Sequence, residues 1–421
     1  MMRFKVFKFG GASVKDAAAI ENLQEILRRY PDDHLVVVIS AMGKTTNFLE
    51  RVLHAYYNAP DQVEGLLAEL QRQHEEVAER LVPDPGSIVD RIQSLFAQLR
   101  TRLSVDHSNN YDFDYDQIVS FGELLSTTII STYLNLIGIP NTWLDARKLV
   151  CTDSTYREGR VDWDVTIQQV RGALLNQEGR VFLTQGFIGG TAENLTTTLG
   201  REGSDYSASI MAYALDAESV TIWKDVPGLL NADPKRFPDA VKLDKIPYEE
   251  AVELSYYGAS IIHPKTLKPL QNKQIPLYVK SFFQPDESGS VITSCSLEKR
   301  IPSIIVKDHQ TLLTVFPRDF SFIAVDNLSE LFAVFAQYRI RVNMMQNSAL
   351  SFSICTDAEP QRVQQCVDAL QERYKVKYNE NVQLITIRHY NKPTIEKVLA
   401  GRTAILRQTS RATIQFVIIE N

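Results

Sequence analysis

Short apolar runs alternate with amphipathic helical stretches over the first 300 residues of the chain. Apolar runs that lack polar alternation indicate strands buried on both faces, as in a parallel sheet. Strands that alternate with helices predict an α/β fold with right-handed crossovers. The expected strands are 3–8, 35–40, 181–185 and 219–223, and the expected helices are 16–30, much of 47–104, 117–137, 165–176 and 204–215.

One helical stretch, 47–104, is unusually long and rich in Glu, Gln and Arg. The segment Pro83-Asp84-Pro85-Gly86 breaks it into two parts. We interpret it as a helical insertion that stands off the sheet, with its charges on a solvated face. A catalytic domain over 1–300 that contains this insertion is the expected organisation.

After residue 306 the pattern changes to that of a ferredoxin-like βαββαβ module, 306–381, followed by a truncated second module, 382–421. Both are poor in catalytic clusters, which favours regulation or assembly. The first is expected to contain strands 311–316, 340–346, 349–356 and 375–379 with helices 327–338 and 361–374. The second is expected to contain strands 382–390, 403–409 and 412–420 with helix 394–399, and its last strand is expected to pair with the sheet of the first module.

Composition excludes several classes of protein. A formal charge of −6 argues against a nucleic-acid or membrane-surface role. The four cysteines form no CxxC pair and are expected to be buried, reduced thiols. Neither a signal peptide nor an apolar run long enough to span a bilayer is visible, so a cytoplasmic protein is expected.

The first strand ends in a sequence suited to polyphosphate. Lys8 supplies a positive charge, and Gly10 and Gly11 let backbone N–H groups approach an anion. A helix is expected to begin near Asp16, and its N-terminus adds partial positive charge.

Four strand ends carry polar or glycine residues, and ligands of parallel sheets bind beyond the carboxyl ends of the strands. The segment Gly43-Lys44-Thr45 resembles the end of a P-loop, but position 38 is valine where that motif needs glycine, so a P-loop is rejected. No Rossmann glycine pattern follows the first strand. The four ends are 8–11, 40–45, 185–190 and 224–228.

A second phosphate-type segment, 196–205, is hydroxyl-rich, is expected to be flexible and leads into a helix. Ser204 or Asp205 could simply cap that helix. Arg201, however, has a guanidinium that matches a carboxylate or phosphate in two-point geometry. Glu123 could complement a helix dipole, or it could hold the ammonium of an amino acid whose carboxylate binds Arg201.

The segment 223–235 could wall a nucleotide base and ribose, although Pro-Gly and Asp-Pro pairs are also ordinary turns. Seven histidines give no metal-binding pattern, and no protein metal site is expected.

Taken together, these segments resemble aspartate kinases of the amino-acid kinase family, in family order over almost all of 1–300. The C-terminal modules resemble the paired ACT modules of that family. The matching segments are Lys8-Phe9-Gly10-Gly11-Ala12-Ser13-Val14, Val38-Ile39-Ser40-Ala41-Met42-Gly43, Ser120-Phe121-Gly122-Glu123, Leu144-Asp145-Ala146-Arg147, Gln185-Gly186-Phe187, Leu199-Gly200-Arg201, Gly203-Ser204-Asp205-Tyr206, Asp225-Val226 through Asp233-Pro234, and Tyr257-Gly258-Ala259 with His263-Pro264.

The resemblance implies transfer of the ATP γ-phosphoryl group to the β-carboxylate of L-aspartate, giving 4-phospho-L-aspartate on the way to lysine, threonine and methionine. It implies an amino-acid-kinase-type sandwich with a mostly parallel sheet, Mg²⁺ carried mainly by the ATP phosphates, a homodimer, and a lysine or threonine effector at the ACT-like module. Neither nucleic acid nor membrane is an expected partner.

Carried over by position, the resemblance assigns roles to individual residues. Lys8 and Asp205 are the expected catalytic residues. The transferring phosphate is expected at Lys8, Gly10, Gly11, Ser40, Gly203 and Ser204; aspartate at Thr45, Glu123 and Arg201; the nucleotide at Lys224, Asp225, Leu230 and Lys235; and an effector at Asn343, Met344, Gln346 and Asn347.

Four positions depart from the family pattern: Glu202, Lys224, Leu230 and Ser260. Two alternatives are a kinase for glutamate or an N-acetylated amino acid, and a non-catalytic amino-acid sensor that keeps the fold. Ser-Phe-Gly-Glu and the ACT-like modules disfavour the first alternative, and Lys8, Arg201 and Asp205 count against the second.

Overall fold

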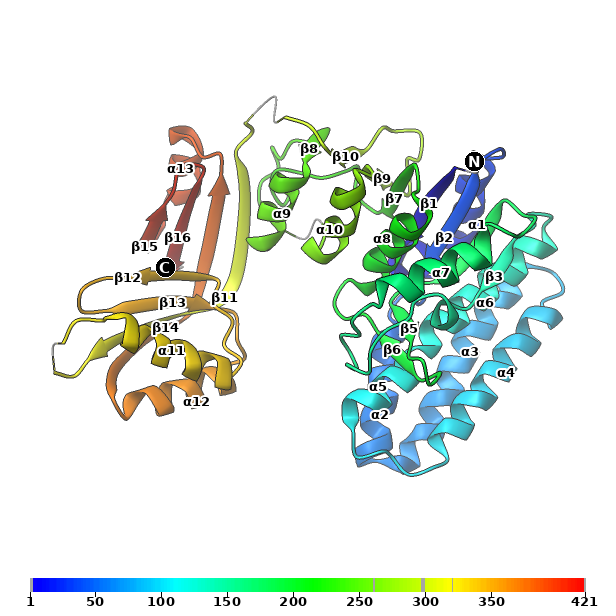
Figure 1. The fold of residues 1–421 in the computed structure, drawn as a ribbon, viewed down its shortest axis with the longest axis horizontal. Helices are drawn as coiled ribbons and strands as arrows, with labels where there is room; N and C mark the ends of the chain where they lie inside the picture. The colour runs from blue at the N-terminus through cyan, green and yellow to red at the C-terminus, as the bar shows by residue number, and fades with distance from the viewer. Residues whose placement is uncertain (1–2, 260–261, 297–299, 320, 420–421) are drawn as a thin grey trace. The chain divides into compact units, whose positions relative to one another are not determined.

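The computed structural model describes residues 3–259, 262–296, 300–319 and 321–419 (Figure 1). The chain forms two compact units. The first contains Met1–Leu229, Lys242–Val252 and Ile262–Ser296, and the second contains Leu230–Val241, Glu253–Ile261 and Leu297–Asn421.

The first unit is built on an eight-stranded sheet in the order β3-β4-β2-β1-β7-β9-β10-β8. Its neighbouring strands pair in parallel except β9 and β10, so the expected mostly parallel central sheet is confirmed. The strands are β1 (Phe4–Phe9), β2 (His34–Ile39), β3 (Thr142–Leu144), β4 (Val181–Gln185), β7 (Ser219–Lys224), β8 (Lys245–Pro247), β9 (Leu277–Ser281) and β10 (Ser290–Thr293).

The register of the central strands places four strand ends side by side. Phe9 at the end of β1 pairs with Ile39 of β2 on one side and with Trp223 of β7 on the other. Ile39 in turn pairs with Gln185, the last residue of β4. The loops that follow β1, β2, β4 and β7 therefore leave the sheet at one edge, where ligands of parallel sheets bind.

Ten helices are described in the chain up to residue 296, and the expected insertion contains three of them. The expected break at Pro83–Gly86 is present, and a second break falls at Ala59 and Pro60, where proline starts a short 3₁₀ turn. The helices are α1 (Ala17–Arg28), α2 (Thr45–Asn58), α3 (Val63–Leu81), α4 (Gly86–Leu103), α5 (Tyr111–Val119), α6 (Phe121–Leu136), α7 (Trp163–Leu174), α8 (Gly203–Leu215), α9 (Tyr248–Tyr256) and α10 (Pro264–Lys273).

Helices α3 and α4 are amphipathic, and their apolar faces extend the main core. Leu67 and Leu70 of α3 and Ile92 and Phe96 of α4 are almost completely buried and belong to the same cluster as residues of β1 and β2. Helix α4 packs on α6, beside α3 (Figure 1). The insertion thus forms a helical layer outside α6, with Glu and Arg side chains on its other face.

A small hairpin follows β4. It consists of β5 (Ile188–Gly190) and β6 (Thr196–Thr198), which pair antiparallel. The sequence predicts flexibility here, but all three threonines of β6 are buried, at 6% exposure or less. Thr196 and Thr198 hydrogen-bond to side chains of α5, and the Thr197 hydroxyl pairs with that of Thr152, so partners within the protein hold this strand.

The second unit contains a six-stranded antiparallel sheet in the order β12-β13-β11-β14-β16-β15. Helices α11 and α12 cover one core of this sheet and α13 covers another. The order β11-α11-β12-β13-α12-β14 confirms the expected ferredoxin-like module. The elements are β11 (Ser303–Pro317), α11 (Val325–Gln337), β12 (Met344–Asn347), β13 (Phe352–Thr356), α12 (Pro360–Gln371), β14 (Tyr374–Arg388), α13 (Lys392–Leu399), β15 (Thr403–Thr409) and β16 (Thr413–Ile419).

Strands β11 and β14 are longer than the sequence predicts, since β14 joins the expected strands 375–379 and 382–390. A bulge accommodates this length, with His309 and Asn381 in left-handed conformation. Strand β16 pairs with residues 383–388, which the sequence predicts to belong to the second module, and not with residues 375–379 of the first. It shares one sheet with the first module because β14 is continuous. The domain boundaries at 306 and 381 remain predictions. Within the described ranges, no helix has the length and apolar character that crossing a bilayer requires.

Candidate functional site

The first feature of the site is an ion pair between β1 and α8. The Lys8 Nζ lies 2.5 Å from the Asp205 Oδ1, and both side chains are largely buried, at 11% and 5% exposure. The opposite charges are in contact, but the angles are not those of a hydrogen bond, so Oδ1 has no hydrogen-bond partner among the described residues. The structure therefore joins the two residues that the sequence assigns to catalysis.

The loop after β1 packs against the loop after β2 through main-chain contacts. The Ser40 N–H donates to the Phe9 carbonyl at 3.1 Å, and the Gly43 N–H donates to the Gly11 carbonyl at 3.0 Å. A Cβ on Gly11 would lie 2.8 Å from the Ala41 carbonyl oxygen, too close for any side chain. A Cβ on Gly10 would lie 3.4 Å from the Lys8 Nζ, so the lysine head group stands over this loop.

Helix α8 begins next to the end of β4. A Cβ on Gly186 would lie 2.6 Å from the Ser204 Cβ, so only glycine allows this approach. Glu202 precedes the helix in left-handed conformation (φ 53°), a conformation that favours glycine. No side chain caps α8, so the interpretation of Ser204 or Asp205 as a cap is wrong: both lie inside the first turn.

The phosphate-binding role expected of the helix near Asp16 fits less well. Asp16 is the N-cap of α1, and its side chain accepts a hydrogen bond from the Ala19 N–H at 2.9 Å. A short 3₁₀ helix, Gly11–Val14, comes between the loop and α1. Helix α8, whose N-terminal N–H groups have no side-chain cap, is the better anion site beside Lys8.

Glu123, in the first turn of α6, is 2% exposed. Its Oε1 accepts a hydrogen bond from the Ala41 N–H at 3.3 Å, while its Oε2 is buried without a partner in the described part of the chain. Burial raises the pKa of Glu123 to about 8, against the smaller lowering effect of the Ala41 N–H. A buried carboxyl with one unused oxygen is suited to receive a cationic ligand.

Thr45 and Arg201 occupy different environments. Thr45 is buried at the start of α2, and its Cγ2 would lie 3.4 Å from a Cβ on Gly122, next to Glu123. Arg201 is exposed and lies between Gly200 and Glu202, both in left-handed conformation. The structure thus brings Thr45 close to Glu123 and leaves the Arg201 side chain at the surface, four residues before Asp205.

The expected nucleotide residues divide between the two units. Lys224 is the last residue of β7 and Asp225 follows it, both in the first unit, and the Lys224 carbonyl accepts a hydrogen bond from the Phe282 N–H at 2.7 Å. Leu230 and Lys235 belong to the second unit. Ser260 lies outside the described residues. The four-residue set therefore remains a prediction.

The expected effector residues lie on or beside β12, an edge strand of the second sheet. Asn343 is part of a polar network: its Oδ1 accepts from the Lys307 Nζ and its Nδ2 donates to the Gln310 Oε1, both at 2.9 Å. Met344 is buried. Only Gln346 and Asn347 of this set are exposed to a ligand.

Sequence reasoning missed Asp116 of α5, which is completely buried and receives three hydrogen bonds from the loops around Arg157 and Thr198. It lies seven residues before Glu123 in a helix whose polar positions resemble an ordinary solvated face. Its hydrogen-bond partners, Arg157 and Thr198, are distant in sequence, and no local pattern marks them.

Comparisons with known proteins agree with this geometry. The family model described as "Amino acid kinase family" matches residues 3–281. Aspartokinase 1, chloroplastic, from Arabidopsis thaliana is 31% identical over 363 residues, which is 84% of this chain and 63% of the relative. The chain thus spans less than two thirds of the length of that protein.

Two crystal structures of aspartokinase III from E. coli resemble the whole fold at 26% identity. The complex with lysine and aspartate (T-state) has a TM-score of 0.84 and covers 98% of this chain and 95% of its own. The complex with aspartate and ADP (R-state) has a TM-score of 0.82 and covers 99% and 96%. The resemblance to aspartokinases is confirmed, and by the extent of the family match this chain belongs to the amino acid kinase family.

Proposed function

We propose that this chain transfers the γ-phosphoryl group of ATP to the β-carboxylate of L-aspartate, giving 4-phospho-L-aspartate and ADP. The observation that carries the proposal is the alignment of four strand ends with the Lys8–Asp205 pair at their edge. The E. coli relatives, crystallised with aspartate and with aspartate and ADP, support the choice of substrates.

The chemistry requires charge neutralisation more than activation of the nucleophile. A carboxylate is ionised at neutral pH and can attack phosphorus directly, but it is repelled by the triphosphate. Lys8 and the uncapped N-terminus of α8, with Gly203 and Ser204, would offset that negative charge. The Gly10 and Gly11 loop, held to Ser40 and Gly43, gives the phosphate a rigid main-chain surface.

For aspartate, Glu123 would hold the α-ammonium and Arg201 the α-carboxylate, with Thr45 beside Glu123. The unused, buried Oε2 of Glu123 supports this assignment, because a charged donor would satisfy it. The Arg201 side chain is exposed and would fold onto the bound carboxylate.

ATP would approach the end of β7 at Lys224 and Asp225. Magnesium would arrive on ATP and supply positive charge to the phosphates. Two buried carboxyl groups, Asp205 and Glu123, lie at this edge, while the described ranges contain no group of three potential metal ligands. Phosphate oxygens would therefore supply most of the ligands.

We infer three further properties. An amino-acid effector, lysine or threonine, would bind at the β12 edge of the second unit; lysine is present in one of the E. coli complexes. A homodimer and a cytoplasmic location complete the proposal. All four cysteines are free thiols; Cys355 and Cys366 are buried as expected, whereas Cys151 and Cys295 are partly exposed.

An assay of ADP release with aspartate, glutamate or N-acetylglutamate as acceptor tests the function. Aspartate should support turnover, and the other two should not. Faster turnover with glutamate or N-acetylglutamate would identify a different amino acid kinase. Nucleotide binding without turnover on any acceptor would replace the enzyme by a sensor.

A further inference from the structure

The carboxylate of Asp116 joins α5 to two loops that are distant in sequence. Its Oδ2 accepts hydrogen bonds from the Arg157 N–H at 2.9 Å and the Thr198 N–H at 2.8 Å. Its Oδ1 accepts from the Thr198 hydroxyl at 2.7 Å. The side chain is completely buried, so each of these bonds replaces water that the carboxylate has lost.

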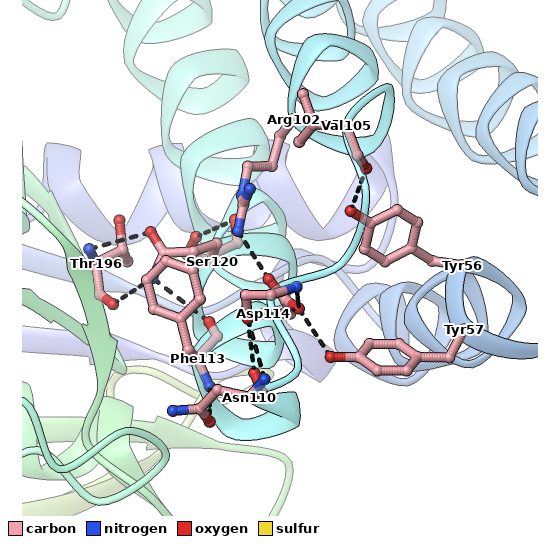
Figure 2. Close-up of polar contacts among 11 residues, drawn as sticks. Tyr56, Tyr57, Arg102, Val105, Asn110, Phe113, Asp114, Ser120 and Thr196 are labelled. Carbon is pink, nitrogen blue, oxygen red and sulfur yellow. Dashed lines mark hydrogen bonds and ion pairs between the residues drawn. The ribbon is translucent and has the colours of Figure 1, made fainter.

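Asp116 thus holds Thr198, the last residue of β6, and the next residue, Gln117, holds Thr196, the first residue of β6. Its Nε2 donates to the Thr196 carbonyl at 2.7 Å, and its Oε1 accepts from the Thr196 N–H at 3.3 Å; the polar contacts of Thr196 are drawn in Figure 2. Strand β6 is therefore attached to α5 at both ends by two consecutive side chains.

Strand β6 leads directly into Leu199, Gly200 and Arg201. Gly200 packs on the turn that Asp116 also holds, since a Cβ on Gly200 would lie 3.0 Å from the Arg157 carbonyl oxygen. The Gly159 N–H donates to the Thr198 carbonyl at 2.8 Å and closes the same turn. The backbone just before Arg201 is thus fixed on both sides by contacts that depend on Asp116.

Helix α5 is itself anchored on its other side. Asp114 is completely buried and accepts hydrogen bonds from the Tyr57 hydroxyl at 2.8 Å, the Arg102 Nη2 at 2.7 Å and the Ser108 N–H at 2.8 Å (Figure 2). A single residue, Ser120, separates α5 from α6, and the first turn of α6 carries Glu123. A fixed α5 therefore connects the Arg201 loop to Glu123.

We propose that Asp116 is a positioning residue of the aspartate subsite, which sets the Arg201 loop at the correct distance from Glu123. The inference rests on the proposed function. Asp116 acts through Thr198 and Arg157 and touches neither substrate. Its loss should therefore weaken the grip on aspartate and leave the nucleotide side of the site unchanged.

The test compares Asp116→Ala with two matched variants. Asp116→Asn keeps a carbonyl oxygen for the two N–H donors, and the Thr198 hydroxyl can rotate to accept from the new amide. Asp112→Ala removes an exposed carboxylate on the same helix, whose contact with the Arg157 guanidinium is a surface ion pair at 3.4 Å. Steady-state kinetics with each substrate varied in turn separate the two sides of the site.

Asp116→Ala should raise the KM for aspartate by about tenfold to a hundredfold, as expected when a contact is misplaced by about 1 Å. The KM for ATP should stay within about twofold. Asp116→Asn and Asp112→Ala should both stay close to the wild type in both constants. Thr198→Val, which removes only the hydroxyl, should show a smaller increase of about threefold to tenfold and serves if Asp116→Ala does not fold.

A pH profile tests whether this position needs a hydrogen-bond acceptor or a negative charge. Burial raises the pKa of Asp116 to about 6, while the Arg157 and Thr198 donors oppose this rise. The charged and titratable groups around it are Arg157 and Tyr156 on the loop and Tyr115 on α5, and burial raises the pKa of both tyrosines. The neutral acid keeps the carbonyl acceptor that Asp116→Asn also keeps, so wild type and Asp116→Asn should share one pH profile of the KM for aspartate, whereas Asp116→Ala should have a raised KM at every pH.

Calorimetric titration of aspartate, without turnover, distinguishes failure of this inference from failure of the proposed function. If wild-type protein turns over aspartate and folded Asp116→Ala keeps its KM within about twofold, the inference is wrong. An equal rise in the KM for ATP also overturns it. If wild-type protein binds aspartate without turnover, only the function fails, and weaker binding by Asp116→Ala would still support the inference. If wild-type protein neither binds nor turns over aspartate, both the inference and the proposed function are wrong.

Discussion

The Nζ of Lys8, near the end of β1, lies 2.5 Å from the Oδ1 of Asp205, in the first turn of α8. Both side chains are largely buried. The pair neutralises a lysine that would otherwise be costly to bury, and it points the ammonium toward the loop at Gly10. Asp205 thus holds the Lys8 ammonium beside the loop that we propose binds phosphate.

Lys8→Ala should lower kcat by about a hundredfold or more, since one lost charge contact at a transition state costs about 3 kcal/mol. It should also lower the melting temperature, because Asp205 would remain buried without its partner. Lys8→Ala with Asp205→Asn should regain stability but not activity. The exposed Lys15→Ala is the matched control; near-normal turnover of Lys8→Ala would refute the phosphate assignment.

Glu123 gives aspartate binding a pH dependence. Its pKa is raised to about 8 by burial, so the carboxyl is mostly neutral at pH 7 in the free protein and must ionise to hold an ammonium. The KM for aspartate should therefore fall as pH rises from about 6.5 to about 8.5, before the substrate ammonium itself titrates. Glu123→Gln should have a higher KM without this trend. A wild-type KM that stays constant over this range would contradict the assignment.

The same carboxyl should destabilise the fold at alkaline pH. A folded-state pKa near 8, above the ordinary 4.5, means that the folded protein holds a proton that the unfolded chain has lost. Stability therefore falls as pH rises between these two values, by at most about 5 kcal/mol. Glu123→Gln should be more stable than wild type at pH 8 and similar near pH 4.5, as thermal unfolding at both pH values would show. Equal differences at both pH values would count against this origin.

Gly186→Ala should disrupt the junction of β4 and α8. The added methyl would lie 2.6 Å from the Ser204 Cβ and push the start of α8 away from the sheet. Activity should fall together with melting temperature. Gly172→Ala, on α7, meets nothing within 4 Å and should be neutral or stabilising by about 0.5–1 kcal/mol. Similar behaviour of the two variants would show that the close approach is unimportant.

Variants of Asn343 and Gln346, beside and on β12, should separate effects on stability from effects on regulation. Asn343→Ala removes one hydrogen bond from Lys307 and one from Gln310 and should destabilise the second unit by about 1–3 kcal/mol. Gln346→Ala, at an exposed position, should change stability by less than about 0.5 kcal/mol. If β12 binds an amino acid, Gln346→Ala should alter inhibition by that amino acid. Unfolding curves and inhibition curves measured together test both parts.

Much of the first unit follows from sequence, because buried parallel strands carry apolar runs that few other structures produce. The strands β1, β2, β4 and β7 all fall within a residue of the expected positions. Their polar ends also predict the edge at which the site lies. The pairing of Lys8 with Asp205 does not follow from local pattern, because only the sheet register brings the two segments together.

Other features depend on tertiary partners that no local pattern encodes. The threonines of β6 look like a solvated segment until Asp116 and Gln117 supply partners for them. Glu202 looks like a defect in a glycine position, yet it adopts the left-handed conformation and accepts a hydrogen bond from the His263 N–H through its side chain. The length of β14 depends on the bulge in its pairing with β11, and only that pairing creates the bulge.

The central claim is that the edge formed by β1, β2, β4 and α8 transfers a phosphoryl group to aspartate. Phosphorus NMR of wild-type protein with ATP, Mg²⁺ and aspartate tests it most directly. The account predicts an acyl-phosphate signal that grows as γ-phosphate disappears, requires aspartate and is lost in Lys8→Ala. Release of inorganic phosphate alone, or an acyl phosphate formed equally well by Lys8→Ala, would contradict it.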